Sequence, residues 1–355
     1  MNFYSDDKLT ALEAKEQAQR LAFAPVSFQT AQALRKLGIL SALTNYQERG
    51  ASAAELALDT GVSEYGVAVL LDMALSIGLV TWQAPNYQLT KLGHFVDHDA
   101  MTIASIDFVA DICYQGMDKL TESIQQAKPV GLQYLGDWET LYPGLSQLTE
   151  QQKNSWFNFD HYYSDRSFGT LLEKVFATPT TSLCDIGANT GKWTLQCCQH
   201  DSQVQVTMVD LPPQLQVALE NMVTHGFQQR VQAQACDLLN PQNALPEGKD
   251  VYWMSQFLDC FSKEQIVSIL TRVTQAMRPD SRVYILELFP DCQPYESASH
   301  ALNATSLYFT AIANGNSRFY MSHEFLPLIE QAGLTIVSQT DNIGLGHTLI
   351  ECHKA

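Results

Sequence analysis

A glycine-containing loop follows a short apolar run near the middle of the chain. The segment LCDIGANTG contains Asp185, Gly187 and Gly191, and the next apolar run, VTMVDLPPQ, contains Asp210. A strand, a tight loop and a helix in this order form a binding site for a nucleotide-type ligand. Three classes of ligand use such loops: nucleoside triphosphates, dinucleotides and S-adenosylmethionine (SAM).

The spacing of the loop residues excludes two of these classes. A phosphate-binding P-loop has four residues between its glycines and then Gly-Lys-Ser/Thr, whereas three residues separate Gly187 from Gly191 and Trp193 follows Lys192. A dinucleotide loop has the pattern G-x-G-x-x-G, and here the third glycine is absent. A pyrophosphate at a helix N-terminus also disfavours a carboxylate such as Asp185. SAM carries an ammonium and a sulfonium, so carboxylates near its loop are favourable.

Two aspartates at successive strand ends support SAM. Asp210 ends the second strand and can accept hydrogen bonds from both ribose hydroxyls. Asp237, in ACDLL after the third strand, can accept the adenine amino group. Carboxylates at the C-terminal ends of parallel strands lie in the ligand crevice. The alternative is that both aspartates only cap their own loops.

The elements that position this loop alternate between strands and helices. From residue 181, short apolar runs such as DVYWMS and SRVYILELF alternate with segments of helical periodicity such as SKEQIVSILTRVTQAM. This alternation predicts a doubly wound, mostly parallel sheet. The last segment, LTIVSQTDNIGLGHTLIECHK, predicts two strands that form an antiparallel edge of that sheet.

The N-terminal third has a different pattern. Ser52 with Glu55 forms a capping box that starts a short helix, and Ser63 caps a second helix. A turn at residues 84–86 then joins LVTW to YQLT as a short hairpin. Helix, turn, helix and hairpin together predict a winged helix. The second helix, SEYGVAVLLDMALS, has no Lys or Arg, so docking or dimerisation is favoured over DNA binding.

Charge and composition narrow the partners. The formal net charge is −17, and residues 1–100 carry 7 basic and 11 acidic side chains. Because phosphate binding needs clustered Lys and Arg, we expect no nucleic-acid partner. No segment approaches eighteen uninterrupted apolar residues, so we expect no membrane span. The 8 cysteines are scattered without a C-x-x-C pair, which favours reduced thiols in a cytoplasmic protein over disulfides or zinc.

Taken together, DIGANTG, DLPP, CDLL and FDHYYSDRS give the chain a family resemblance. It resembles the SAM-dependent O-methyltransferases with an N-terminal winged-helix dimerisation domain, which include plant phenolic and bacterial polyketide methyltransferases. The resemblance implies an α/β fold, in which an all-helical winged-helix dimerisation domain precedes a Rossmann-like class I methyltransferase domain with a mixed seven-stranded sheet. The implied divisions are residues 1–100 (winged-helix dimerisation domain), 101–175 (helical linker and substrate-pocket segment) and 176–355 (SAM-binding methyltransferase domain).

The resemblance also assigns ligand-contacting positions. Phe159 is implied to face the substrate. His300, on a helix expected to line the pocket, is the best spare candidate for a base, unless it is a surface histidine. No metal site is implied. The implied cofactor contacts are Tyr163, Ser167, Asp185, Gly187, Gly191, Asp210, Leu211, Asp237, Leu238 and Ser255, the last of which replaces a lysine often found near the cofactor.

At the catalytic position the chain departs from the family. Relatives have a histidine base after the fourth strand, and FLDCFSKEQ places Asp259 there. Glu287 in YILELF matches the first of two glutamates that flank the base, whereas Ser317 replaces the second. A dry pocket and a neighbouring carboxylate would both raise the pKa of Asp259, which would help it accept the proton of a phenol.

The leading hypothesis is a SAM-dependent methyltransferase that acts on a small aromatic or polyketide-like acceptor at a hydroxyl oxygen. One alternative is C-methylation of a phenol ring, in which Asp259 again removes the phenolic proton. Another is a non-catalytic regulatory protein that binds SAM or a metabolite. The apolar N-terminal helices predict a homodimer, because they carry more apolar surface than a small domain can bury.

Overall fold

The computed structural model describes residues 3–164 and 167–355, without the side chains of residues 161, 163 and 164. The chain separates into two compact units, Tyr4–Ile112 and Cys113–Ala355, the second of which also includes Phe3. Each unit is described by itself, and the finer division at residues 100 and 175 stays a prediction. No described helix is long and apolar enough to cross a membrane.

The smaller unit is a helical domain with one hairpin. Its core is formed by apolar side chains of α2, α3, α5 and β1, including Leu34, Leu43, Leu71 and Val80. Ser52 forms the predicted capping box with Glu55, and Ser63 accepts from the backbone of Gly66. These findings confirm the predicted helix starts and the winged hairpin. The elements are α1 (Ala11–Ala22), α2 (Ala24–Lys36), α3 (Ile39–Tyr46), α4 (Ala53–Thr60), α5 (Glu64–Ser76), β1 (Val80–Gln83), β2 (Asn86–Leu89), α6 (Lys91–His98) and α7 (Ala100–Phe108).

The larger unit contains a seven-stranded sheet in the order β5-β4-β3-β6-β7-β9-β8. The first five strands in this order are parallel, and β9 pairs antiparallel with both β7 and β8. This confirms the predicted mixed sheet and its antiparallel edge. The strands are β3 (Ser182–Ile186), β4 (Gln205–Asp210), β5 (Val231–Ala235), β6 (Val251–Ser255), β7 (Arg282–Glu287), β8 (Leu334–Ile343) and β9 (His347–Lys354).

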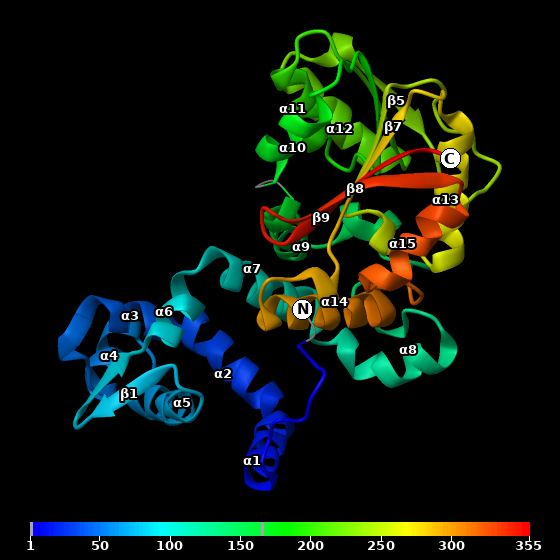
Figure 1. Cartoon of the computed structure of the whole chain (residues 1–355). Helices are drawn as coiled ribbons and strands as arrows, with labels where there is room; N and C mark the ends of the chain where they lie inside the picture. The colour runs from blue at the N-terminus through cyan, green and yellow to red at the C-terminus, as the bar shows by residue number, and fades with distance from the viewer. Residues whose placement is uncertain (1–2, 165–166) are drawn as a thin grey trace. The chain divides into compact units, whose positions relative to one another are not determined.

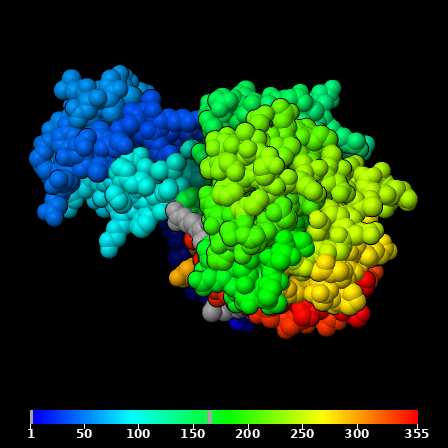
Figure 2. All heavy atoms as spheres, turned by 90° about the horizontal axis from the view of Figure 1, so that it is seen from above, coloured from blue at the N-terminus to red at the C-terminus, as the bar shows by residue number. Residues whose placement is uncertain are grey.

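Helices cover both faces of this sheet (Figure 1). Strand residues alternate between the faces: Leu183 packs with α10, α11 and α12, whereas Cys184 packs with α13 and α15. In the space-filling view, the green and yellow atoms of this unit form a continuous surface (Figure 2). The helices are α8 (Leu120–Gln126), α9 (Glu150–Ser164), α10 (Phe168–Val175), α11 (Lys192–His200), α12 (Pro212–Thr224), α13 (Lys263–Ala276), α14 (Glu296–Tyr308) and α15 (Ser322–Gln331).

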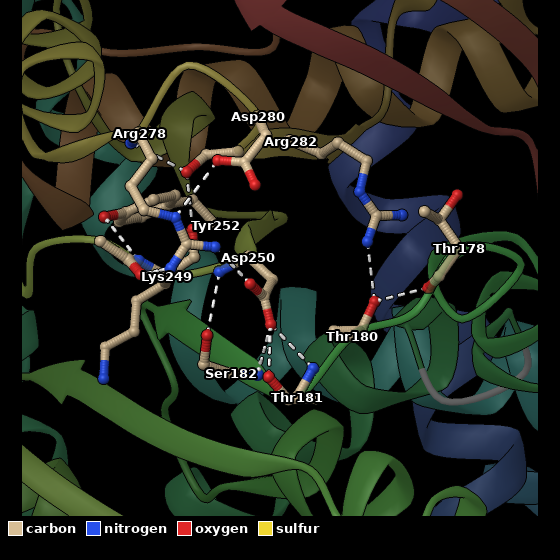
Figure 3. A network of polar contacts seen from close by, with 12 residues as sticks. Thr178, Thr180, Thr181, Ser182, Lys249, Asp250, Tyr252, Arg278, Asp280 and Arg282 are labelled. Carbon is tan, nitrogen blue, oxygen red and sulfur yellow. Dashed lines mark hydrogen bonds and ion pairs between the residues drawn. The ribbon is translucent and has the colours of Figure 1, made fainter.

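A polar network fastens the N-terminal ends of three central strands (Figure 3). The carboxylate of Asp250, just before β6, accepts from Thr181 N (2.8 Å), Thr181 Oγ1 (2.8 Å) and Ser182 N (2.9 Å), just before and at the start of β3. Its other oxygen pairs with Arg278. Arg282, which starts β7, donates to Thr180 Oγ1 (2.7 Å). Hydrogen bonds and an ion pair between these side chains and the backbone therefore connect the N-terminal ends of the three strands.

Candidate functional site

The cofactor loop connects β3 to α11 at the C-terminal edge of the sheet. Gly187 has φ +77°, and a Cβ placed on it would lie 2.3 Å from the Phe257 ring. Gly191, with φ +76°, is the N-cap residue of α11, and a Cβ there would lie 3.2 Å from that of Ala218. Left-handed backbone and close neighbours together require glycine at Gly187. The loop backbone therefore packs closely against Phe257 at Gly187 and against Ala218 at Gly191.

Asp185, in β3, lies directly below this loop. Its side chain is 2 % exposed, and it accepts a hydrogen bond from Thr194 Oγ1 at 2.6 Å. Burial is the main cause that raises the pKa of Asp185, to about 7. The hydrogen bond from Thr194 lowers this pKa, and the charge of Asp210 raises it. Asp185 thus connects β3 to the first turn of α11.

Asp210 and Asp237 lie at the ends of β4 and β5, as predicted. Asp210 Oδ2 accepts from Asn189 N at 2.8 Å, and its Oδ1 accepts from Leu211 N at 2.7 Å. Asp237 is exposed and accepts from Leu239 N at 2.9 Å. Both aspartates therefore cap backbone groups of the loops. Because a carboxylate has about four acceptor sites, this capping leaves sites for a ligand.

Several buried polar atoms around the loop lack a hydrogen-bond partner among the described residues. They are Ser255 Oγ at the end of β6, Gln256 Oε1 in the next residue and Thr190 Oγ1 in the loop itself. A buried polar group without a partner costs about 1–3 kcal/mol, so such groups mark a place where a ligand supplies the missing partner. The donor and acceptor set around the loop therefore fits a polar nucleoside such as SAM.

The catalytic candidates Asp259 and Glu287 are brought together by a backbone contact. Asp259 lies in the short 3₁₀ helix η7 (Leu258–Cys260), and Glu287 ends β7. Glu287 Oε1 accepts from Phe257 N (3.1 Å) and Leu258 N (2.8 Å), which fixes η7 over the end of β7. Their side chains are 5 % and 1 % exposed. Asp259 Oδ1 and Glu287 Oε2 have no hydrogen-bond partner in the described part of the chain.

This pair retains protons at neutral pH more readily than ordinary carboxyls. Burial raises the pKa of Asp259 to about 7; the Cys260 side chain lowers it by hydrogen bonding, and the charge of Asp160 raises it. Burial, followed by the charge of Asp259, raises the pKa of Glu287 well above its ordinary value. Two adjacent carboxylates in a dry site resist simultaneous ionisation. The pair can therefore bind one proton and release it near neutral pH.

Aromatic and amide side chains from distant segments lie near Cys260, the residue after Asp259. Trp156 Nε1 donates to Tyr308 OH at 2.8 Å. Asn314 Nδ2 donates to Tyr142 OH (3.2 Å) and to Cys260 O (2.8 Å). Sequence reasoning missed Tyr142 and Asn314. The available signal was the richness in aromatic residues between residues 101 and 175, which does not show which ring faces the pocket.

The remaining predicted residues lie in varied places. Ser167 is buried, and its Oγ lies 3.2 Å from His347 Nδ1. His300 is exposed, because α14 buries its neighbour Ser299 instead. The side chain of Tyr163 lies outside the described residues. Three others lie in the loops or on α9: Leu211 is the N-cap of α12, Leu238 is buried, and Phe159 is half-buried.

Comparison with known proteins identifies the domains of this chain. Residues 15–87 match the Dimerisation2-like domain, and residues 152–335 match the O-methyltransferase domain. The L-tyrosine C(3)-methyltransferase of Streptomyces lavendulae is 21% identical over 317 residues, which cover 88% of this chain and 85% of that protein. The 3-hydroxy-5-methyl-1-naphthoate 3-O-methyltransferase of Streptomyces sahachiroi is 23% identical over 325 residues, which cover 87% of this chain and 86% of the relative.

Solved structures have the same fold. The mitomycin 7-O-methyltransferase MmcR superposes with a TM-score of 0.74 at 19% identity, covering 96% of this chain and 98% of that one. The seven-stranded mixed sheet, with a loop that fits SAM at the C-terminal ends of its strands, is that of a class I methyltransferase. The chain belongs to the O-methyltransferase domain family and is a SAM-dependent methyltransferase.

Proposed function

We propose that this enzyme methylates a hydroxyl oxygen of a small aromatic or polyketide-like acceptor, with Asp259 as the base. One observation carries the proposal: Asp259 and Glu287 are both buried, Glu287 bonds to the backbone next to Asp259, and each carboxyl has an oxygen without a partner in the described residues. Relatives named for hydroxynaphthoate and L-tyrosine support an aromatic acceptor. The rings of Trp156, Tyr142 and Tyr308 supply apolar surface for one.

In this site each residue has a distinct role. When bound, SAM supplies a methyl group activated by its sulfonium. Asp259 Oδ1 takes the proton of the acceptor hydroxyl and holds it while oxygen becomes the nucleophile. Glu287 keeps η7 in place through two backbone hydrogen bonds, and burial followed by the charge of Asp259 raises the pKa of Glu287 itself. The buried surroundings exclude water from the reacting oxygen, so positioning supplies much of the acceleration.

The cofactor contacts are proposed on the same basis. The loop backbone around Gly187 and Gly191 would approach the methionine part of SAM, with Asp185 beneath it. Asp210 and Asp237 would accept from the ribose and the adenine, and Ser255 Oγ would gain the partner it lacks. The further contacts proposed are Tyr163, Ser167, Leu211 and Leu238, with Phe159 facing the acceptor.

Methylation of a ring carbon is the second candidate. The relative named as an L-tyrosine C(3)-methyltransferase favours it, since that name describes transfer to carbon. Both reactions begin with removal of the phenolic proton by Asp259, and they differ in the atom that attacks. Fragmentation of the product in a mass spectrometer distinguishes a methyl ether from a ring-methylated phenol.

Incubation with labelled SAM and a panel of phenols, followed by mass spectrometry, tests the function. The Asp259→Asn variant should lower kcat by about 100-fold or more, the scale of lost general base catalysis, while the SAM Kd stays within about twofold. Asp280→Asn, an exposed carboxylate at the opposite sheet edge, is the matched control and should retain kcat. Equal turnover in Asp259→Asn would remove Asp259 from the mechanism.

We also propose that the enzyme is a cytoplasmic homodimer. The match of residues 15–87 to a dimerisation domain supports the dimer, and exposed apolar side chains such as Leu12, Leu21 and Phe23 supply surface for it. The 8 cysteines are all free, which supports a reducing compartment. Light scattering should give twice the chain mass of 39.6 kDa, and a monomer mass would contradict the dimer.

A further inference from the structure

A further carboxylate, outside the predicted site residues, lies beside the cofactor loop. Asp160 is on α9 and is half-buried. Its Oδ2 lies 3.4 Å from Asn189 Nδ2, and Asn189 is a residue of the loop between Gly187 and Gly191. The backbone of Asn189 is itself held by Asp210. Asp160 is therefore fixed at the cofactor side of the site.

The same carboxylate acts on the acceptor side. Its charge raises the pKa of Asp259 and also contributes to the raised pKa values of Cys260 and Tyr308, each of which is dominated by burial. Asp259 is the proposed base, Cys260 is its neighbour in the chain, and the charge of Asp160 also reaches Tyr308. Asp160 therefore contacts the loop of the proposed cofactor site and is near enough to the proposed base to act on it electrostatically.

We propose that Asp160 is the counter-charge for the sulfonium of SAM. The inference rests on the proposed function, in which the methyl group must lie between the cofactor loop and Asp259. A cation in this position is stabilised by a nearby carboxylate, and the stabilisation is stronger where water is excluded. Asp185 is engaged by Thr194, and Glu287 by the backbone of η7, so neither takes this role.

This role would make the site discriminate between substrate and product. S-adenosylhomocysteine (SAH), the demethylated product, has a neutral thioether where SAM has a cation. Asp160 therefore favours SAM and gives no such stabilisation to SAH. The same charge difference would help the product leave after each turnover.

Calorimetric titration of the full chain with SAM and with SAH tests the inference without any acceptor. In Asp160→Asn the amide oxygen can still accept from Asn189, so the loop contact is retained while the charge is removed. We expect the SAM Kd to rise about tenfold, a difference of about 1.4 kcal/mol, and the SAH Kd to stay within about twofold. Asp160→Glu should preserve the wild-type ratio of the two Kd values, and Asp280→Asn should change neither.

A ligand comparison with the wild-type protein tests the inference even if the Asp160→Asn variant does not fold. Sinefungin has an ammonium-bearing carbon where SAM has its sulfonium, so the wild-type protein should bind it more tightly than SAH. Equal weakening of SAM and SAH in Asp160→Asn, or equal wild-type affinity for sinefungin and SAH, would overturn the inference and leave the proposed function standing. Absence of wild-type binding to both SAM and SAH would instead overturn the proposed cofactor site.

Discussion

The two edges of the central sheet both carry buried or partly buried aspartates, but the hydrogen-bond donors available to these carboxylates differ. At the N-terminal edge, Asp250 receives donors from Thr181, Ser182 and Arg278 (Figure 3). Although burial raises it, these hydrogen bonds hold the pKa of Asp250 well below its usual range. At the C-terminal edge, Asp259 and Glu287 each have an oxygen without a donor in the described chain, and their pKa values are raised.

The difference separates stability from chemistry within one sheet. A carboxylate whose oxygens all have donors has a low pKa. It stays ionised near neutral pH and links the strands through its hydrogen bonds. A carboxylate buried without enough donors is costly to ionise and can take a proton from a substrate. In an open α/β sheet, ligands bind at the C-terminal ends of the strands, which is the edge where the costly groups lie.

The largest effect is expected from breaking the N-terminal edge. Asp250→Ala removes the acceptor of three backbone and hydroxyl donors and one guanidinium, so the free energy of unfolding should fall by about 3 kcal/mol. Chemical denaturation followed by circular dichroism measures it. Asp280→Ala, which removes an exposed carboxylate near Arg278, should change stability by less than about 0.5 kcal/mol. Equal losses in both variants would show that Asp250 does not hold this edge.

The C-terminal edge should reveal its raised pKa in the pH dependence of activity. A protonated Asp259 cannot act as a base, so kcat/KM for SAM should rise with pH through a midpoint near the Asp259 pKa of about 7. At pH 5, two units lower, kcat/KM should be about 100-fold below its plateau. Initial rates with labelled SAM in buffers of constant ionic strength give the profile. A midpoint near 4, the value of an ordinary aspartate, would contradict the contrast between the edges.

Two glycines provide a matched pair for the close approach at the cofactor loop. Gly187 and Gly226 have nearly equal φ angles of +77° and +78°, but a Cβ would meet Phe257 at 2.3 Å only at Gly187, since nothing lies within 4 Å at Gly226. Gly226→Ala should cost about 1 kcal/mol for the left-handed backbone alone. Gly187→Ala should cost about 2 kcal/mol more, because the Phe257 ring must shift.

Thermal and chemical unfolding of the two variants measure this difference. SAM titration should show weaker binding for Gly187→Ala and unchanged binding for Gly226→Ala. Identical stability of the two variants would mean that the loop tolerates a side chain against Phe257.

The smallest effect, a change in the free energy of unfolding, is expected from replacing Glu287 at the C-terminal edge. Between the unfolded pKa of Asp259, near 4, and its folded pKa of about 7, the folded state binds more protons, so stability falls as pH rises. Glu287→Gln keeps an acceptor for Phe257 N and Leu258 N but removes a buried carboxyl whose pKa is raised. It should raise the free energy of unfolding at pH 8 by about 1 kcal/mol and flatten the pH dependence. A lower stability at pH 8 would contradict the raised pKa of Glu287.

Local sequence signals were sufficient where one residue and its near neighbours determine a structure. The capping boxes and caps at Ser52 and Ser63 and the hairpin at residues 80–89 follow from residue type and short spacing. The sheet follows from the alternation of apolar runs and helical segments. The place of Asp210 follows from its position at a strand end. There it accepts from the backbone of Asn189 and Leu211, which is the loop-capping alternative stated from the sequence.

Contacts between distant segments could not be predicted in the same way. Asp160 and Asn189 are close only because α9 packs beside the cofactor loop, and Asn314 reaches Tyr142 from another part of the unit. The exposure of His300 depends on which side of α14 is buried, which periodicity alone did not resolve. The pairing of Asp259 with Glu287 was available through family resemblance, whereas their unpartnered oxygens were visible only in the structure.

The unpartnered oxygens of Asp259 and Glu287 also bear on how this chain can be engineered. An amide at either position removes a buried ionisable group while keeping an acceptor, so a library selected only for resistance to heat should accumulate Asn at residue 259 and Gln at residue 287. The selected variants should be more stable and have little turnover, because the two carboxyls that lower stability are the ones that activity needs.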